Sequence, residues 1–368
     1  MSKASIDYSS AGVDYSRIDA LKIRAQQAAR ATASALGAHG ARELERSRGE
    51  SAYVIDVGGV LIASVTECLG TKSLVADAVR AVSGRTHYDT LAQDTIAMAV
   101  NDLITVGATP LAVQAYWAAG GSDWFSDAER MADLVRGWQA ACERCGVAWG
   151  GGETPALAGV VEAGRVDLAA SCIGVVPSGR SILGDRLAAG DAIVLVAASG
   201  IHANGVSLAR RLAERLERGY ATPSVDGRPC GEALLDPTVL YPPVMAAVWA
   251  AGVTPHYCVN VTGHGWRKLM RHPGEFTYRL SRVPPVPPVL EFLRRELPLD
   301  AAEAYGSLNM GAGFALYVAP GDAQRVVRAA RDTGSDAWVS GTVEPGPRRV
   351  VIEPIGVTYE ADALKLRA

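Results

Sequence analysis

The sequence of 368 residues lacks the long apolar segments that would place it in a membrane. No run reaches the ~18 apolar residues that a membrane-spanning helix needs. The first 14 residues are polar and contain no apolar core of a secretory signal, and six cysteines are few for a chain of this length. We therefore expect a cytoplasmic protein with reduced cysteines and no membrane partner.

A basic excess is also missing. Lys and Arg number 36 against 39 Asp and Glu, which gives a formal net charge of -3. Nucleic-acid-binding surfaces are normally basic, so we expect no nucleic-acid partner. Hydrophobic residues make up 49% of the chain and charged residues 20%, as in ordinary globular proteins. The length suggests two domains.

Several catalytic motifs are absent as well. The chain has no G-x-x-x-x-G-K-[ST], H-E-x-x-H, G-x-S-x-G or complete G-x-G-x-x-G, which disfavours P-loop, zinc-protease, α/β-hydrolase and Rossmann interpretations. A single C-x-x-C, Cys142 to Cys145, could be a redox or zinc motif. Both cysteines follow the apolar spacing of a helix that Ser126 and Glu129 would begin as a capping box, so we favour packing.

The hydrophobic pattern mixes helices and strands in both halves, which predicts an α/β (α+β) fold. A Ser/Gly/Pro-containing stretch, 177–190, predicts a boundary between domains 1–177 and 178–368. We expect helices at 18–37, 74–83, 90–106, 126–145, 206–219 and 322–333, and strands at 53–57, 60–65, 111–118, 167–176, 191–198 and 312–318.

The predicted helix 90–106 is apolar almost all round, yet it carries Asp94, Asn101 and Asp102. Asp94 and Asn101 share one stripe of the helix, and Asp102 lies about 80° round from Asp94. A bare carboxylate is costly to bury unless it is paired or binds a metal. These oxygens would suit Mg²⁺ bridged to phosphates. In the alternative interpretation, Asp102 caps a neighbouring helix and Asp94 pairs with an arginine.

The ends of this helix are also marked in the sequence. Thr90 and Gln93 have the spacing of a capping box, so we expect the helix to begin there. Gly107 would end it, and Pro110 would prevent its continuation.

Four further clusters combine glycine with polar residues near expected strand ends. Each could bind phosphate or substrate through backbone N–H groups, hydroxyls or a charged side chain, and each could instead be an ordinary surface turn. The clusters are Thr66 to Lys72, Gly150 to Pro155, Ser199 to Gly205, and Asn260 to Trp266.

Taken together and in order, these segments resemble the aminoimidazole ribonucleotide synthetase (phosphoribosylformylglycinamidine cyclo-ligase) family over essentially the whole chain. The resemblance is carried by Ala11-Gly12-Val13-Asp14, Gly70-Thr71-Lys72, Gln93-Asp94, Asn101-Asp102-Leu103, Asp102-x4-Gly107-Ala108-x-Pro110, Gly151-Gly152-Glu153-Thr154, Ser199-Gly200-x-His202-x-Asn204-Gly205, Thr262-Gly263 and Gly311-x-Gly313.

The resemblance implies two α/β domains and a homodimer in which the N-terminal sheets of two subunits form a shared barrel. It implies ATP-driven ring closure of formylglycinamidine ribonucleotide in purine biosynthesis, with Mg²⁺ and K⁺ as candidate ions. It implies catalytic roles for Lys72, Glu153 and His202; nucleotide contacts for Gly70, Thr71, Lys72, Asp94, Asn101, Asp102 and Gly107; substrate contacts for Ser199, Gly200, His202, Asn204, Gly205 and Thr262; and metal contacts for Glu67, Asp94 and Asp102.

The chain also departs from the family pattern. Thr-Glu67-Cys-Leu stands where the family usually has T-D-G-V, and Ser47 to Ser51 replaces a glycine-phenylalanine-glycine loop. Asn260 stands where the family tends to have histidine, and His264 lies inside the following glycine motif. A thiamine-phosphate kinase-like or selenophosphate synthetase-like enzyme, or a non-catalytic nucleotide-binding relative, is therefore an alternative. No cysteine precedes Cys68, which disfavours the selenophosphate synthetase.

Overall fold

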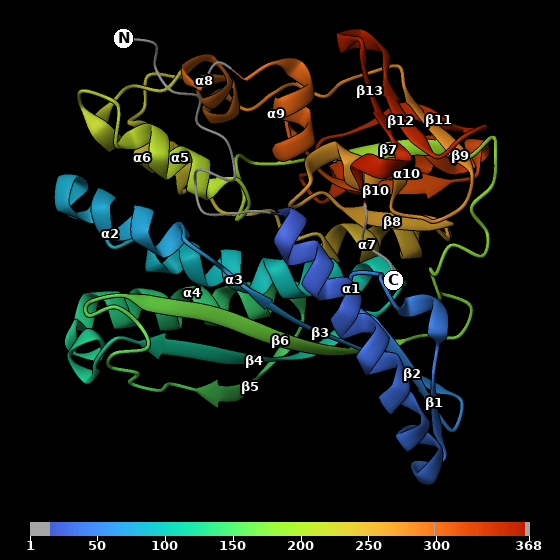
Figure 1. Cartoon of the computed structure of the whole chain (residues 1–368), viewed down its shortest axis with the longest axis horizontal. Coiled ribbons are helices and arrows are strands. Elements are labelled where there is room, and N and C mark those ends of the chain that lie inside the picture. The colour runs from blue at the N-terminus through green and yellow to red at the C-terminus, as the bar shows by residue number, and fades with distance from the viewer. Residues whose placement is uncertain (1–14, 298, 365–368) are drawn as a thin grey trace.

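The computed structural model describes residues 15–297 and 299–364, so the Ala11–Asp14 motif lies outside the described residues. Each half of the chain is built around its own sheet (Figure 1). The first sheet has the strand order β1-β2-β3-β6-β4-β5, antiparallel except for the β4–β5 pair. Its strands are β1 (Ala41–Glu43), β2 (Tyr53–Val57), β3 (Val60–Cys68), β4 (Thr109–Ala119), β5 (Ala148–Glu153) and β6 (Val166–Val176).

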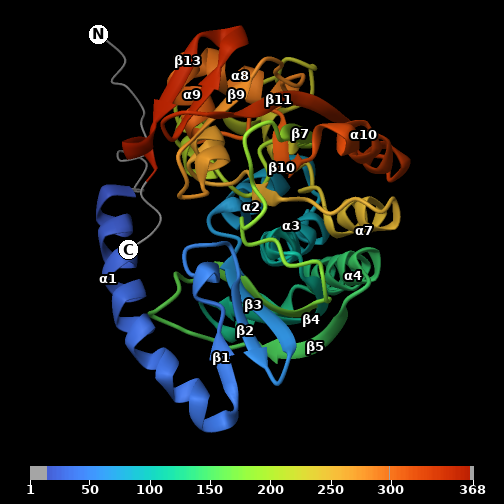
Figure 2. The ribbon, with the colours of Figure 1, turned by 90° about the vertical axis from the view of Figure 1, so that its right-hand side faces the viewer.

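Helices cover one face of this sheet. They are α2 (Lys72–Ser83), α3 (Tyr88–Leu103) and α4 (Ala128–Cys145). Helix α3 lies between the first sheet and the second domain, which explains why it is apolar on every side (Figures 1 and 2). Helix α1 (Tyr15–Thr32) runs along the side of the molecule, and a hollow of about 760 Å³ separates it from the outer face of the sheet.

The second sheet has the order β13-β12-β9-β11-β7-β10-β8 and is antiparallel except for the β9–β12 pair. Its strands are β7 (Ala192–Ala197), β8 (Tyr257–Asn260), β9 (Phe276–Leu280), β10 (Ala312–Val318), β11 (Ala337–Pro345), β12 (Arg349–Ile352) and β13 (Val357–Glu360). The helices of this domain are α5 (Val206–Ala213), α6 (Cys230–Leu234), α7 (Pro242–Ala250), α8 (Pro288–Glu296), α9 (Ala301–Ser307) and α10 (Ala323–Asp332).

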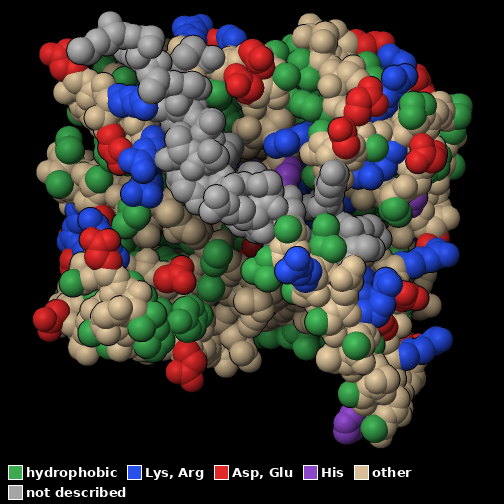
Figure 3. Space-filling model, in the orientation of Figure 1, with side chains coloured by type: hydrophobic (Ala, Val, Ile, Leu, Met, Phe, Trp, Pro, Cys, Tyr) green, Lys and Arg blue, Asp and Glu red, His purple; other side chains and the backbone are tan. Residues whose placement is uncertain are grey.

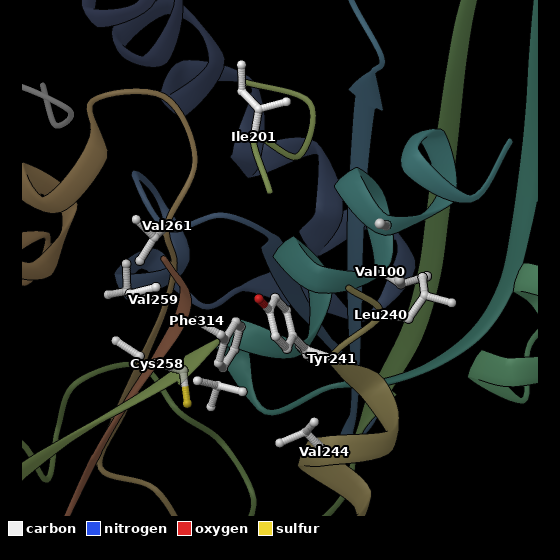
Figure 4. Close-up of a cluster of buried hydrophobic side chains, with 14 of the residues drawn as sticks. Val100, Ile201, Leu240, Tyr241, Val244, Cys258, Val259, Val261 and Phe314 are labelled. Carbon is white, nitrogen blue, oxygen red and sulfur yellow. The ribbon is translucent and has the colours of Figure 1, made fainter. Parts of the chain in front are cut away.

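The two domains share a continuous apolar core. Val100 of α3 lies near Leu240 and Tyr241, and the Tyr241 ring packs on Phe314 of β10 with 5.2 Å between centroids (Figure 4). The Tyr241 hydroxyl donates to the carbonyl of Ala197 at 2.8 Å. Burial of these side chains fixes α3 against the second domain, so polar groups at this contact are held rigidly.

The predicted mixed α/β fold in two domains is confirmed, and the expected boundary at 177/178 falls in the connection between β6 and β7. Both predicted capping boxes are wrong. Helix α3 begins two residues before Thr90, after His87, and Asp127 rather than Ser126 caps α4 by accepting from the Arg130 N–H. The predicted helix 206–219 ends early, at Ala213.

The role of the C-x-x-C pair was also predictable. Cys142 is buried on α4 beside the core and Cys145 is half-buried, and burial raises the pKa of both thiols, to about 11 and about 12. Packing is therefore the correct interpretation of this pair.

Basic and acidic side chains are interspersed on the face in Figure 3. Within the described residues, no helix combines the length and apolarity that crossing a membrane requires.

Candidate functional site

A cavity of about 270 Å³ lies where the two domains meet. The N-terminal half contributes residues from α1, the 47–51 loop, β3 and α3, and the second domain contributes the loops that follow β7 and β8. Its lining consists of Lys22, Glu50, Ser51, Glu67, Met98, Asp102, Asn204, Thr262, Gly263, His264, Lys268 and Arg271. Four residues predicted for the site therefore meet here: Glu67, Asp102, Asn204 and Thr262.

Three carboxylates line the cavity: Glu50, which lies against Arg271 and Tyr257, and the pair Glu67 and Asp102. Asp102 accepts a hydrogen bond from the amide of Asn260 at 2.7 Å. Burial and the neighbouring charge of Asp102 raise the pKa of Glu67 to about 7. An acid whose ionisation is disfavoured by burial and by a neighbouring carboxylate is stabilised in its charged form by a nearby cation. This pair is therefore suited to a divalent ion that also contacts phosphate oxygens.

Lys268 forms the basic part of the cavity, on the 3₁₀ turn Gly265–Met270. Its side chain is only 7% exposed. The ammonium donates to the hydroxyl of Thr262 and to the carbonyl of Asn260, the latter at 3.5 Å. Burial lowers the pKa of Lys268 to about 8, against the opposing attraction of Asp102. The cavity thus holds charges of both signs in a confined space.

The 47–51 loop, where the family's glycine-phenylalanine-glycine segment is missing, is fastened to the second domain. Arg271 donates to the Gly49 carbonyl at 2.9 and 3.1 Å and to the Ser51 hydroxyl at 2.9 Å. The Tyr257 hydroxyl donates to the Glu50 carboxylate at 2.8 and 3.0 Å. The replacement loop is thereby held against the cavity as part of its wall.

Asp94 does not line this cavity. Its carboxylate and the Lys72 ammonium are both 0% exposed and lie 2.7 Å apart. The other oxygen of Asp94 accepts from the N–H and the hydroxyl of Thr238, at 2.7 and 2.5 Å. The predicted triad Glu67, Asp94 and Asp102 is not assembled, and among the described residues no group of three or more acids, histidines or cysteines is placed to hold a metal. The ion-pair interpretation of Asp94 fits, with a lysine in place of an arginine.

Lys72 does not line the cavity either. Besides its ion pair with Asp94, its ammonium donates to the carbonyl of Asp236 at 3.2 Å. Asn101 makes a similar interdomain contact: it donates to the Val239 carbonyl at 2.8 Å and accepts from the Tyr241 N–H at 2.9 Å. Three polar side chains of α3, those of Gln93, Asp94 and Asn101, thus bond to the backbone of the 236–241 segment. They hold the two domains together.

His202 is buried between the same elements. Its Nε2 accepts from the Ser199 N–H at 3.3 Å, and burial together with the charge of Lys72 lowers the pKa of His202 to about 3. The imidazole is therefore neutral at physiological pH. Ser199 donates its hydroxyl to the Pro237 carbonyl at 2.6 Å, and the Gly200 carbonyl accepts from Asn309 at 2.8 Å. Three of the predicted substrate residues are thus engaged in holding their own loop.

Asn204 extends from this loop into the cavity, and its amide lies 3.7 Å from the sulfur of Met98. Gly205 follows with φ +90° and begins α5. The Gly70–Lys72 loop meets this region from the other domain, since the Thr71 and Ser207 hydroxyls are 3.4 Å apart. The loop 199–205 and the start of α2 therefore face each other across the domain boundary.

Two predicted residues lie away from the cavity. Gly107 has φ +84°, and a Cβ there would collide with the carbonyl of Arg180 in the interdomain connection, so its role is to let two backbone segments approach closely. Glu153 is exposed on β5, where the glycine-rich segment forms a strand instead of a loop. There it borders a separate hollow on the outer face of the sheet, with Thr66 and Gln114.

Sequence reasoning missed the buried Lys268 and the partly buried Arg271, two cations of the cavity. Neither belongs to a recognised motif. The available signal was weak: Lys268 lies within the short segment Trp266 to Met270, and Arg271 follows it directly. The fold, not the local pattern, brings them to the same cavity as Glu67 and Asp102.

Comparison with known proteins agrees with this architecture. Residues 49–176 match the family described as "AIR synthase related protein, N-terminal domain". Residues 188–353 match the family described as "AIR synthase related protein, C-terminal domain". A phosphoribosylformylglycinamidine cyclo-ligase of Symbiobacterium thermophilum is 34% identical over 374 residues, covering 96% of this chain and 99% of that protein. The corresponding protein of Sorangium cellulosum is 36% identical, with 92% and 95% covered.

Solved structures share the fold at low identity. The HypE-HypF complex matches with a TM-score of 0.58 and 16% identity, covering 85% of this chain and 93% of that chain. T. maritima PurL complexed with ATP matches with a TM-score of 0.51 and 17% identity, covering 83% and 44%. The two family domains span most of the sequence in order, and similarity to the relatives extends over nearly their whole length. The chain belongs to the phosphoribosylformylglycinamidine cyclo-ligase family.

Proposed function

We propose that the protein closes the imidazole ring of aminoimidazole ribonucleotide from formylglycinamidine ribonucleotide, using ATP, in purine biosynthesis. The observation that carries the proposal is the interdomain cavity, in which the carboxylates of Glu67 and Asp102, the buried Lys268 and hydrogen-bonding side chains meet. Full-length similarity to cyclo-ligases supports the assignment of the substrate.

The chemistry explains why such a site is needed. An amide oxygen is a poor leaving group, and its phosphorylation makes it a good one. The amidine nitrogen then attacks the activated carbon, the C–O bond breaks, and phosphate leaves with the oxygen of the amide. Phosphoryl transfer of this kind requires mainly positioning and neutralisation of charge.

Glu67 and Asp102 fit a Mg²⁺ ion that accompanies the nucleotide. The raised pKa of Glu67 reflects two acids in a confined site, and a bound divalent cation would favour their ionised forms. When bound, the ion would neutralise charge on the phosphates. Asn260 holds Asp102 in place by its 2.7 Å hydrogen bond, so this departure from the family pattern is accommodated. K⁺ stays a prediction.

The remaining side chains of the cavity would position the substrate. Asn204 offers an amide and Thr262 a hydroxyl, both suited to ribose or phosphate oxygens. His202, neutral and bonded to the Ser199 N–H, would position the loop that carries Asn204. The nucleotide contacts predicted for Gly70 and Thr71 would come from the backbone at the start of α2.

We further propose a homodimer formed through the outer face of the first sheet. Neighbouring strands β4 and β6 expose large apolar side chains there: Leu111 at 49%, Tyr116 at 38% and Ile173 at 46%. Clustered exposed apolar residues on a sheet are typical of an interface. Glu153 borders the same face, so dimerisation would bring it next to a second copy.

The six cysteines are free, which fits a reducing cytoplasm.

The test measures ADP formation by the purified protein with MgATP, with and without formylglycinamidine ribonucleotide, while the aminoimidazole product is assayed. ADP that depends on this substrate and equals the product supports the proposal. ATP binding without product would contradict it and would direct attention to another ATP-using reaction of the superfamily.

A further inference from the structure

Two buried lysines lie near the domain boundary, and their surroundings differ. Lys72 is neutralised directly by Asp94 at 2.7 Å and lies outside the cavity lining. Lys268 lines the cavity beside Glu67 and Asp102. Position alone therefore distinguishes the lysine that can meet a ligand from the one that cannot.

The partners of Lys268 are neutral. Its ammonium donates to the Thr262 hydroxyl and the Asn260 carbonyl. Among the described residues, no carboxylate lies within ion-pair distance of this ammonium, although the residue is only 7% exposed; Asp102 and Glu67 attract it from further away. A buried ammonium without a direct counter-charge is costly, and a bound anion would compensate that cost.

We propose that Lys268 is the phosphate-binding lysine of this site and that Lys72 is a structural residue. The proposal rests on the proposed function and deepens it. The ammonium of Lys268 would contact oxygens of the phosphoryl group that is transferred from ATP, while Glu67 and Asp102 hold the accompanying divalent ion.

The charge pattern of the cavity fits this division of roles. A transferring phosphoryl group carries charge on several oxygens and is stabilised by cations on more than one side. Arg271, a partly buried cation of the lining, already donates to the Gly49 carbonyl and the Ser51 hydroxyl and lies 3.5 Å from the Glu50 carboxylate. Lys22 is exposed on α1, which leaves Lys268 as the buried cation of this lining with neutral partners that an anion could replace.

The experiment compares Lys268→Met, Lys268→Arg and the control Arg42→Met, which changes an arginine on β1 whose side chain is 80% exposed. We expect Lys268→Met to lower kcat by about 10²–10³-fold, as loss of one group that stabilises transition-state charge does. Lys268→Arg should retain activity to within about tenfold of wild type. Lys268→Met should unfold at a denaturant concentration close to that of wild type, because it removes both the cost of burying an ammonium and the attraction of that ammonium to Asp102 and Glu67. Arg42→Met should resemble wild type.

Calorimetric binding of magnesium tripolyphosphate provides a readout that does not depend on ring closure. Weaker binding by Lys268→Met than by Lys268→Arg supports the assignment even if wild type forms no aminoimidazole product, in which case only the proposed function fails. Equal binding and equal kcat in wild type and Lys268→Met would overturn it. Equal losses in Arg42→Met and Lys268→Met would also overturn it, since they would indicate an effect of net charge and not a contact with phosphate.

Discussion

Replacing Lys72 with methionine should weaken the folded state far more than a surface change would. Lys72 and Asp94 are both fully buried, with their charged atoms 2.7 Å apart. Removing one partner of such a pair leaves an uncompensated buried charge, which costs about 3–5 kcal/mol. The hydrogen bonds from Thr238 to Asp94 are present in wild type and in the variant alike, so they do not replace the lost counter-charge.

The measurement is equilibrium unfolding in urea of wild type, Lys72→Met, Asp94→Leu and the double variant. Both single variants should lose about 3–5 kcal/mol, and the double variant should lose less than the sum of the two, because neither charge is then left alone. The control is Arg42→Met, which removes an arginine that is 80% exposed from a surface pair and should change stability by less than about 1 kcal/mol.

Additive losses in the double variant would refute the ion-pair account. Stabilisation by Mg²⁺ of wild type and of a variant that lacks Asp102, but not of Asp94→Leu, would also refute the ion-pair account. That result would assign Asp94 to the metal site.

Three further predictions concern other parts of the molecule. Gly107→Ala should cost about 2–5 kcal/mol in unfolding free energy, from about 1–2 for the left-handed backbone and about 1–3 for the collision, whereas Gly146→Ala, whose Cβ would meet open space, should cost only the backbone part. Glu67 has a folded pKa of about 7 against a model-peptide value near 4.5, so its stabilising contribution is full below pH 4.5 and is lost as pH rises through about 7; in metal-free protein, Glu67→Gln should flatten this dependence by up to about 3 kcal/mol. Ile173→Asp should convert a dimer to a monomer in sedimentation velocity, and Val160→Asp, on a loop and 81% exposed, should not; a wild-type monomer would contradict the dimer proposal.

Elements with strong periodicity were predictable from the sequence. Strands β3, β4, β6, β7 and β10 are apolar or alternating runs, and α3 is a long apolar segment, so the sequence predicts them near their observed bounds. The segment 148–153 was missed as a strand because three glycines signal a turn, yet pairing with β4 imposes extended structure on it. The predicted helix starts were wrong for two reasons. Helix α3 begins after His87, whose left-handed backbone and lack of a capping bond leave no signal in the sequence, and α4 begins after Asp127, which is as typical a cap as its neighbour Ser126.

The site was predictable only in part. Motif spacing identified Glu67, Asp102, Asn204 and Thr262, which the fold brings to one cavity. Spacing cannot show which partner a buried charge finds across a domain boundary. Asp94 and Asp102 lie on the same helix, but Asp94 meets Lys72 and Asp102 meets Asn260. Asn260 is 158 residues away from Asp102 in the sequence, so this contact depends on the tertiary fold.

The most direct test of the central claim follows the oxygen that leaves during ring closure. Formylglycinamidine ribonucleotide labelled with ¹⁸O at the amide oxygen is incubated with the protein and MgATP, and the released phosphate is analysed by mass spectrometry. Phosphorylation of that oxygen predicts one labelled oxygen in each phosphate, with one aminoimidazole formed per ADP. Unlabelled phosphate, or ADP without the aminoimidazole product, would contradict the account.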